Sequence, residues 1–266
     1  MRRVVVWILV LSAALAAYGA AAAWAQPISV DAEQAEEAVA LPEAQVVRER
    51  EAPGDSAGLT HFLFFSGADI WRNGAFAHGG FLYAYQGLNQ DGPVFKLLLH
   101  GGFYRFRSGG TDILGEQIMG AALPGWRWNR PGLEVTLFGG VDVQNHRYTP
   151  DDPTNRLRGT HVGLRGGFDV WYEPFSDWML TGSASLSTAG HSYWSRAALG
   201  GRFFHAVWFG PEFLAMGDDS YRQLRFGAHI TSLRAFGTEW SAGAGWVTDS
   251  DRRDGMYGRI GVLIRK

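Results

Sequence analysis

The chain has no cysteine among its 266 residues. Without thiols, no disulfide can brace the fold, and neither a zinc–thiolate site nor a thiol redox site can form. A strong net charge is also missing, because 24 lysines and arginines face 26 aspartates and glutamates, for a formal net charge of −2. Nucleic-acid-binding domains are usually strongly basic, so this balance argues against nucleic acid as a partner.

Common catalytic and cofactor motifs are missing as well. The sequence contains no H-E-x-x-H, no G-x-x-x-x-G-K-[ST] and no dinucleotide glycine fingerprint. Two copies of "HGGF", at 78–81 and 100–103, resemble the oxyanion loop of some esterases, but both lie in alternating segments and no G-x-S-x-G elbow follows. The acidic pairs at 151–152 and 249–251 are more typical of turns than of calcium sites. We therefore expect no enzyme, no cofactor and no bound metal.

Long apolar runs are absent except at the amino end. Arg2 and Arg3 precede an apolar run at 4–17, and Ala23-Trp24-Ala25 offers an A-x-A cleavage site. This pattern predicts a signal peptide at 1–25 and export by the general secretory pathway, because the run is short for a membrane helix of about 20 residues. Residues 26–58 hold eight acidic residues, two arginines and no aromatics, which predicts an acidic flexible segment.

Alternation of apolar with polar or small residues dominates the rest of the chain. Twelve segments follow it: 61–71, 75–86, 94–107, 111–124, 132–147, 159–173, 177–190, 193–204, 208–217, 221–235, 238–248 and 255–265. Most are longer than the roughly five or six residues of ordinary strands and match the roughly 9 to 11 of a tilted membrane-spanning strand. Length therefore favours strands that cross a membrane.

The faces and connections of these segments agree with that interpretation. In 159–173, Val162 and Leu164 share one face and His161 and Arg165 share the other. Charge gathers in alternate connections, whereas four of the five intervening ones contain Trp, as expected at a bilayer interface. The sequence predicts an all-β fold at 59–266: an up-and-down antiparallel transmembrane β-barrel of about 12 strands in the outer membrane, with lipid as a partner.

Strand parity assigns a set of charged and aromatic side chains to the lumen. They are Asp69, Glu134, Asp142, Arg165, Asp169, Trp171, Trp194, Arg196, Arg202, Glu212, Arg225, His229 and Arg259. They either brace a narrow barrel through ion pairs or line a glycan pathway, and parity does not separate the two. Glu116 is ambiguous, because a one-residue slip would exchange it with Gln117.

Residues 148–159, "YTPDDPTNRLRG", interrupt the alternation with two prolines and several turn-forming residues. We predict an external loop there. Its candidate contact residues for a polymer or partner are Tyr148, Asp151, Asp152, Asn155, Arg156 and Arg158.

This stretch, with "YWSRAALGGRF" and "GPEFLAMGDDSYRQLRFGAHI", resembles the BcsS family of bacterial cellulose-biosynthesis proteins. The resemblance implies a secreted protein associated with cellulose synthesis, with cellulose or other synthesis components as partners and no catalytic residues to transfer. The leading hypothesis is a non-enzymatic barrel that assists cellulose secretion or surface anchoring. Two alternatives remain: a lipid-modifying barrel enzyme using His191 with Ser192 or Ser195, and a general diffusion channel.

Overall fold

The computed structural model describes residues 60–203 and 207–266, so the predictions for 1–25 and 26–58 lie outside the described residues. The elements are β1 (Phe62–Trp71), β2 (Gly74–Ala84), β3 (Gly92–Ser108), β4 (Thr111–Arg130), β5 (Leu133–Thr149), β6 (Gly159–Phe175), β7 (Trp178–Ser187), the 3-10 turn η1 (Ala189–His191), β8 (Tyr193–Phe203), β9 (Val207–Gly217), β10 (Arg222–Ala235), β11 (Thr238–Asp249) and β12 (Asp254–Arg265). No helix in these two ranges is long and apolar enough to span a membrane.

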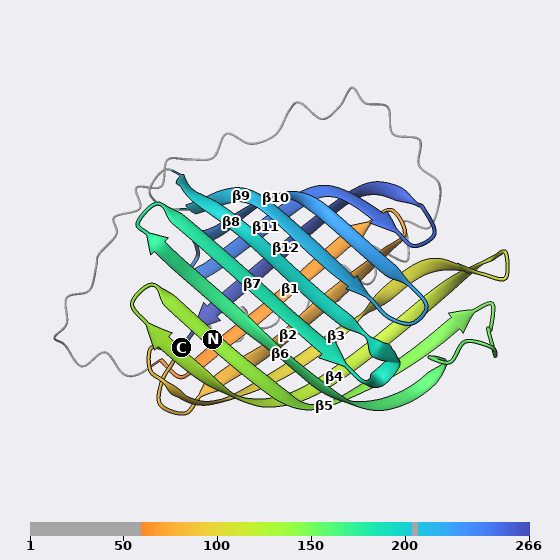
Figure 1. Ribbon diagram of the computed structural model, residues 1–266, viewed down its shortest axis with the longest axis horizontal. Coiled ribbons are helices and arrows are strands. Elements are labelled where there is room, and N and C mark those ends of the chain that lie inside the picture. Colours follow the sequence, from red (N-terminus) through yellow and green to blue (C-terminus); the bar gives the residue numbers. More distant parts are fainter. Residues whose placement is uncertain (1–59, 204–206) are drawn as a thin grey trace, which may run out of the picture.

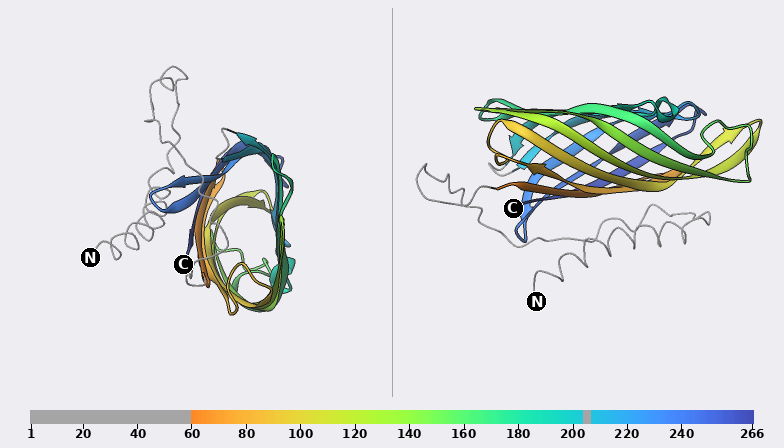
Figure 2. Two further views of the ribbon diagram at one scale, coloured as in Figure 1. Left: turned by 90° about the vertical axis from the view of Figure 1, so that its left-hand side faces the viewer. Right: turned by 90° about the horizontal axis from the view of Figure 1, so that it is seen from below.

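The strands form one closed, antiparallel barrel in which each strand pairs with its neighbours in sequence (Figures 1 and 2). β1 closes the sheet against β12, in a register that runs from Leu63 opposite Arg265 to Trp71 opposite Tyr257. Closure pairs the strand edges that an open sheet would leave exposed, which is what a membrane-spanning sheet requires. The predicted twelve-stranded up-and-down barrel is confirmed.

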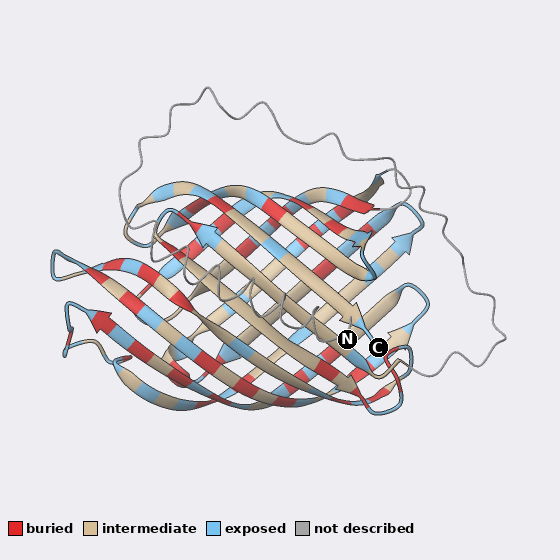
Figure 3. Cartoon of the chain, turned by 180° about the vertical axis from the view of Figure 1, so that it is seen from behind, coloured by how far each residue is buried: buried red, intermediate tan, exposed pale blue. Residues whose placement is uncertain are grey.

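Buried and exposed residues alternate along strands such as β5 (Figure 3), and the barrel exterior is apolar. Large exposed apolar side chains include Ile70, Leu99, Ile118, Leu137, Val141, Val162, Leu164, Phe168, Leu180, Leu186, Phe209, Leu224, Phe226, Trp246 and Ile260. The sequence therefore places its apolar face outward, which is the reverse of a soluble sandwich and the arrangement of a barrel in lipid.

The two ends of the barrel differ in their connections. The chain enters and leaves at one end, where the Phe62 N–H donates to the Lys266 carbonyl at 2.6 Å. At this terminus-side end the connections 131–132, 176–177 and 236–237 are tight turns, whereas the opposite end carries the longest connection, 150–158. β3 to β6 also project beyond the other strands at that opposite end (Figure 1). By the usual asymmetry of such barrels, we call this the outer end.

β4 is longer than the sequence predicts. The expected segment ended at 124, with a turn around the two prolines, but the strand continues to Arg130. Pro124 lacks an N–H, so the ladder to β5 lapses between Ala122 and Gly125, yet the register on both sides of the gap is the same. A proline therefore removes hydrogen bonds here without ending the strand.

Aromatic side chains gather on the outside near the terminus-side end. Trp126, Trp128 and Trp178 are exposed there, as expected of an interfacial belt. Trp208 does not belong to it, although it was counted among the tryptophans of the predicted interfacial belt. It faces the lumen, is buried, and carries the Arg202 guanidinium 4.3 Å above its ring.

Candidate functional site

The thirteen side chains assigned to the lumen by parity all lie on the inward face of their strands. They do not form one continuous site. The structure distributes them among separate ion-paired clusters and a pair of cavities along the barrel axis. Glu116 points outward and is exposed, whereas its neighbour Gln117 faces inward and donates to Gln144 at 3.2 Å.

The first cluster surrounds Asp142, which is fully buried on β5. The Arg165 guanidinium on β6 donates to it at 3.1 Å and the Ser187 hydroxyl on β7 at 2.9 Å. Gln144 donates to the same carboxylate at 2.6 Å and also to the Ser192 hydroxyl at 3.1 Å. These bonds fasten three successive strands and the η1 connection from the inside.

The second cluster surrounds Glu212 on β9, which is also fully buried. Arg196 on β8 donates to it at 3.0 Å, and Arg259 on β12 at 2.9 Å. The Tyr257 hydroxyl adds a third donor at 3.0 Å. Because β9 and β12 are not neighbours, the last two contacts cross the lumen and hold it narrow.

A third pair, Asp69 with Arg225, also crosses the lumen. The guanidinium on β10 meets the carboxylate on β1 at 3.1 Å and lies 4.7 Å from the ring centre of Trp71. Arg225 itself is 1% exposed. The centre of the Tyr257 ring lies 5.2 Å from the same guanidinium. The charge of Arg225 is therefore compensated by the Asp69 carboxylate and by the faces of two aromatic rings.

Two cavities lie along the axis. The terminus-side cavity has a volume of about 660 Å³ and its walls include Arg127, Glu134, Trp171 and Arg202. The outer cavity has a volume of about 310 Å³, and aromatic side chains form much of its wall.

The two cavities share the wall residues Phe65, Lys96, Asp169 and Ser183. There the Lys96 ammonium on β3 meets Asp169 on β6 at 2.7 Å and lies 4.3 Å from the ring centre of Phe138. This cross-lumen ion pair is the constriction between the cavities.

Sequence reasoning found Asp169 but missed Lys96. On β3 the inward residues Val94, Leu98 and Phe106 are as apolar as the outward ones, so a polar face does not mark the lumen. Lys96 and His100 lie four residues apart on β3 and therefore share its inward face. These two polar residues at an even spacing were the signal in the sequence that could have identified that face.

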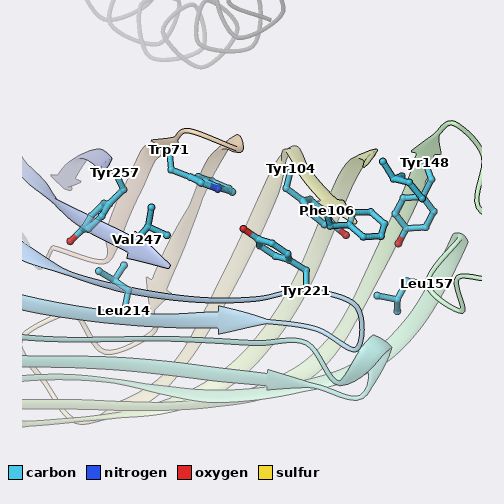
Figure 4. Packing of buried hydrophobic residues seen from close by; sticks show 10 residues of the cluster. Trp71, Tyr104, Phe106, Tyr148, Leu157, Leu214, Tyr221, Val247 and Tyr257 are labelled. Atoms are coloured by element: carbon cyan, nitrogen blue, oxygen red, sulfur yellow. The ribbon is translucent and has the colours of Figure 1, made fainter. Parts of the chain in front are cut away.

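The outer mouth is closed by a cluster of buried apolar and aromatic side chains (Figure 4). The outer mouth cluster consists of Trp71, Tyr104, Phe106, Ile113, Tyr148, Leu157, Leu214, Tyr221, Val247 and Tyr257. Tyr221 enters it from the β9–β10 connection and lies 5.4 Å from Tyr104 on β3, on the other side of the barrel. The interior is therefore a packed plug at this end.

The β5–β6 connection folds over this mouth. Leu157 is 3% exposed within the cluster, and the Ser220 hydroxyl donates to the Asn155 side chain at 3.3 Å. Two of the predicted loop contacts are buried instead of exposed: Tyr148 points into the barrel, and Asp152 is 8% exposed. The Thr154 hydroxyl donates to Asp152 at 2.6 Å and holds the pKa of that carboxyl below its usual range.

The outward-facing part of that loop consists of Asp151, Arg156 and Arg158. Arg158 pairs with Asp151 at 2.7 Å, and both side chains are more than half exposed. Arg156 is exposed, with no side-chain partner within residues 60–203 and 207–266. The loop therefore presents an exposed ion pair and a single cation to the outside.

The alternative hypothesis of a lipid-modifying enzyme requires His191 to contact Ser192 or Ser195, but these side chains contact other partners. His191 pairs with Asp219 at 3.0 Å on the outer rim. Ser192 accepts from Gln144 inside the barrel, and Ser195 donates to the Ala215 carbonyl at 3.2 Å. The two "HGGF" histidines, His78 and His100, face each other across β2 and β3. Within the described ranges, no three metal-ligating side chains gather into a candidate metal site.

Fold and lumen together define a closed, membrane-type β-barrel with an ion-paired interior and a packed outer mouth. Residues 63–266 match the family described as cellulose biosynthesis protein BcsS, and the chain belongs to that family. A comparison with curated proteins found no match.

Several solved barrels are similar in outline. The KdgM porin aligns at 9% identity and a TM-score of 0.43, covering 76% of this chain and 98% of that one. LpxR from Salmonella typhimurium aligns at 12% identity and a TM-score of 0.42, covering 76% and 99%. The transport unit of the autotransporter AIDA-I from Escherichia coli aligns at 7% and 0.41, covering 82% and 92%. Similarities of this order transfer no activity.

Proposed function

We propose that the chain is a non-enzymatic barrel of the outer membrane that assists the export or surface anchoring of cellulose. Delivery to that membrane by the general secretory pathway is part of the proposal. The observation that carries it is the match of the whole barrel, residues 63–266, to a cellulose-biosynthesis family. The apolar exterior and the charged, cavity-bearing interior support a role inside a lipid bilayer.

A non-enzymatic role is supported by the way the reactive groups are used. A nucleophile needs an adjacent base that is itself oriented. Here Ser192 serves the Asp142 cluster, whereas His191 binds Asp219 at 3.0 Å on the rim. Buried carboxylates such as Asp142 and Glu212 are saturated by cations and hydroxyls, as is typical of braces.

A guided pathway is favoured over a general diffusion channel. A general channel needs an open aqueous lumen, but here the Lys96–Asp169 pair and the outer mouth cluster interrupt the axis. Both obstructions consist of side chains, so local rearrangement can open them without breaking the strand ladder. A polymer arriving from the terminus side would first occupy the larger cavity, of about 660 Å³.

The test is deletion of the gene in the native host, followed by two separate assays. Cellulose at the cell surface is measured by enzymatic digestion, and cellulose synthesis is measured in isolated inner membranes. We expect surface cellulose to fall while synthesis in isolated membranes is unchanged, and a plasmid copy to restore the surface polymer. Unchanged surface cellulose in the deletion strain would overturn the proposal.

A further inference from the structure

Three aromatic rings lie side by side on the inner wall of the outer cavity, one from each of β1, β2 and β3. Trp71 and Phe76 are nearly parallel, with ring centres 5.8 Å apart and planes 8° apart. Phe76 and Tyr104 follow at 6.2 Å and 26°. The three rings thus form a continuous row, which we call the aromatic row; Figure 4 shows Trp71 and Tyr104 in place.

Glycines let these rings lie against the wall. A Cβ on Gly74 would lie 2.7 Å from the Trp71 ring, and a Cβ on Gly102 would lie 2.7 Å from the Phe76 ring. Each ring therefore occupies the space above a glycine on a neighbouring strand. Phe76 is the least buried of the three rings, whereas the Arg225 guanidinium lies over the Trp71 ring and the Tyr221 ring lies against Tyr104.

The row also carries polar atoms that the fold pairs poorly: the Trp71 indole has only the Tyr221 hydroxyl near it, and the Tyr104 hydroxyl has only that of Tyr148. The indole N–H of Trp71 and the hydroxyl of Tyr104 are buried and form no hydrogen bond of standard geometry with any described residue. Trp71 is 6% exposed and Tyr104 is 3% exposed. A buried unpaired donor costs about 1 to 3 kcal/mol, so such groups call for an external partner.

The charges around the outer cavity select against an ionic ligand. Its three cations are each paired with a carboxylate: Lys96 with Asp169 at 2.7 Å, Arg225 with Asp69 at 3.1 Å, and Arg165 with Asp142 at 3.1 Å. A carboxylated or phosphorylated ligand would find no unpaired cation there and would meet the Asp218 carboxyl. A neutral ligand with hydroxyl groups and a flat apolar face meets no such penalty.

We propose that the aromatic row is a binding site for pyranose rings of a neutral, β-linked glucan. The inference rests on the proposed function and assigns it a site. The axial C–H groups of a β-linked glucose ring stack on Phe76, the least buried ring of the row. The sugar hydroxyls accept from the Trp71 indole and exchange hydrogen bonds with Tyr104. The cavity volume of about 310 Å³ suits a short piece of such a chain.

The test is calorimetric titration of the full chain in detergent with cellohexaose, with an oligogalacturonate of equal length as the anionic comparison. We expect the wild type to bind the neutral hexamer and not the anion. Trp71→Leu and Phe76→Leu each weaken binding about tenfold, whereas Phe76→Tyr keeps the ring and the affinity. Trp246→Leu, on the lipid face of β11, is the matched control and binds as wild type.

Access is tested separately with Tyr221→Ala, which removes the ring over Tyr104 and opens the cavity from outside. Absence of cellohexaose binding to both wild type and Tyr221→Ala overturns the site, as does tighter binding of the anion. Every variant is first required to keep the folded barrel's mobility on unboiled gels. If binding fails while the deletion strain still loses surface cellulose, the site falls and the proposed function stands. If cellohexaose binds as expected while the deletion strain keeps its surface cellulose, the proposed function falls and the site stands.

Discussion

Glu212 on β9 links three strands inside the barrel, because it accepts hydrogen bonds from side chains on β8 and β12. It receives Arg196, Arg259 and the Tyr257 hydroxyl, all within 3.0 Å and all away from solvent. Both guanidinium groups are compensated mainly by this one negative charge, because Arg196 and Arg259 have no other carboxylate within 4.0 Å in the described chain.

Glu212→Gln should therefore destabilise the barrel by about 3 kcal/mol, since it leaves two buried cations with a neutral partner. The measurement is the urea midpoint of unfolding in detergent, read from unboiled gel mobility. Glu116→Gln is the control, because Glu116 is exposed on the outer face and exposed pairs contribute about 0 to 1 kcal/mol. Equal midpoints for both variants would show that the Glu212 cluster is not a brace.

Asp218 gives the outer mouth a pH dependence. Burial raises its pKa to about 6, even though the Ser220 and Tyr221 N–H groups donate to it. The folded pKa lies above the unfolded value, so the folded loop gains stability as pH falls from about 6 toward 4 and loses it as pH rises through that range. Because the loop places Tyr221 in the outer mouth, the mouth should be held more firmly in acid.

Limited proteolysis of the β9–β10 connection at pH 5 and pH 7.5, with cleavage normalised to an unrelated substrate, measures this effect. Wild type should resist cleavage better at pH 5. Asp218→Asn, which stays neutral, should show the same resistance at both values. A pH dependence that persists in Asp218→Asn would assign the effect to another group.

At the scale of the strands, paired glycines set how closely neighbouring strands approach. In the pair on β3, a Cβ on Gly102 would overlap the Ala75 carbonyl oxygen, whereas a Cβ on Gly101 would find its nearest neighbour at 3.5 Å. The same contrast recurs at 79–80, 139–140 and 166–167: the inward glycine is confined and the outward one is not.

Gly102→Val should consequently prevent folding into the heat-modifiable form, and Gly101→Val should fold normally. The two substitutions add the same side chain at adjacent positions, so each controls for the other. Folding is read as the fraction of protein with shifted gel mobility after refolding into detergent. Normal folding of Gly102→Val would mean that the strand spacing can relax at this point.

The strands were predictable where one face is polar and the other apolar. β6, β7 and β10 follow that rule, and their inward residues were found by parity alone. The rule fails for β1 to β3, where Phe65, Phe76 and Leu98 make the inner wall as apolar as the outer one. The aromatic row and Lys96 were missed for this reason. Contacts across the lumen, such as Tyr221 with Tyr104, depend on closure and on loop conformation, which alternation does not encode.

On the scale of the whole molecule, the barrel is a closed structure held by ion pairs that cross its interior. Glu212 with Arg259, Asp69 with Arg225 and Lys96 with Asp169 each join strands that are not neighbours. The barrel is flattened in cross-section, as the end-on view in Figure 2 shows. A lumen of this kind should conduct ions poorly in its resting state.

Planar-bilayer recordings test this expectation. Wild type should give no large, steady channels, whereas the double variant Tyr104→Ala/Tyr221→Ala, which empties the centre of the outer mouth, should raise conductance. Leu224→Ala, at an exposed apolar position on the lipid face, should behave as wild type. Large open channels in the wild type would favour the general diffusion channel.

The most direct test of the central claim is where the full-length protein resides in its native cells and how it migrates. Separated membrane fractions are run on gels with and without boiling. A folded barrel in the outer membrane should appear in that fraction and migrate faster unboiled than boiled, because its closed strand ladder resists detergent. A protein found soluble in the periplasm, with the same mobility before and after boiling, would contradict both the membrane-spanning barrel and the role proposed for it.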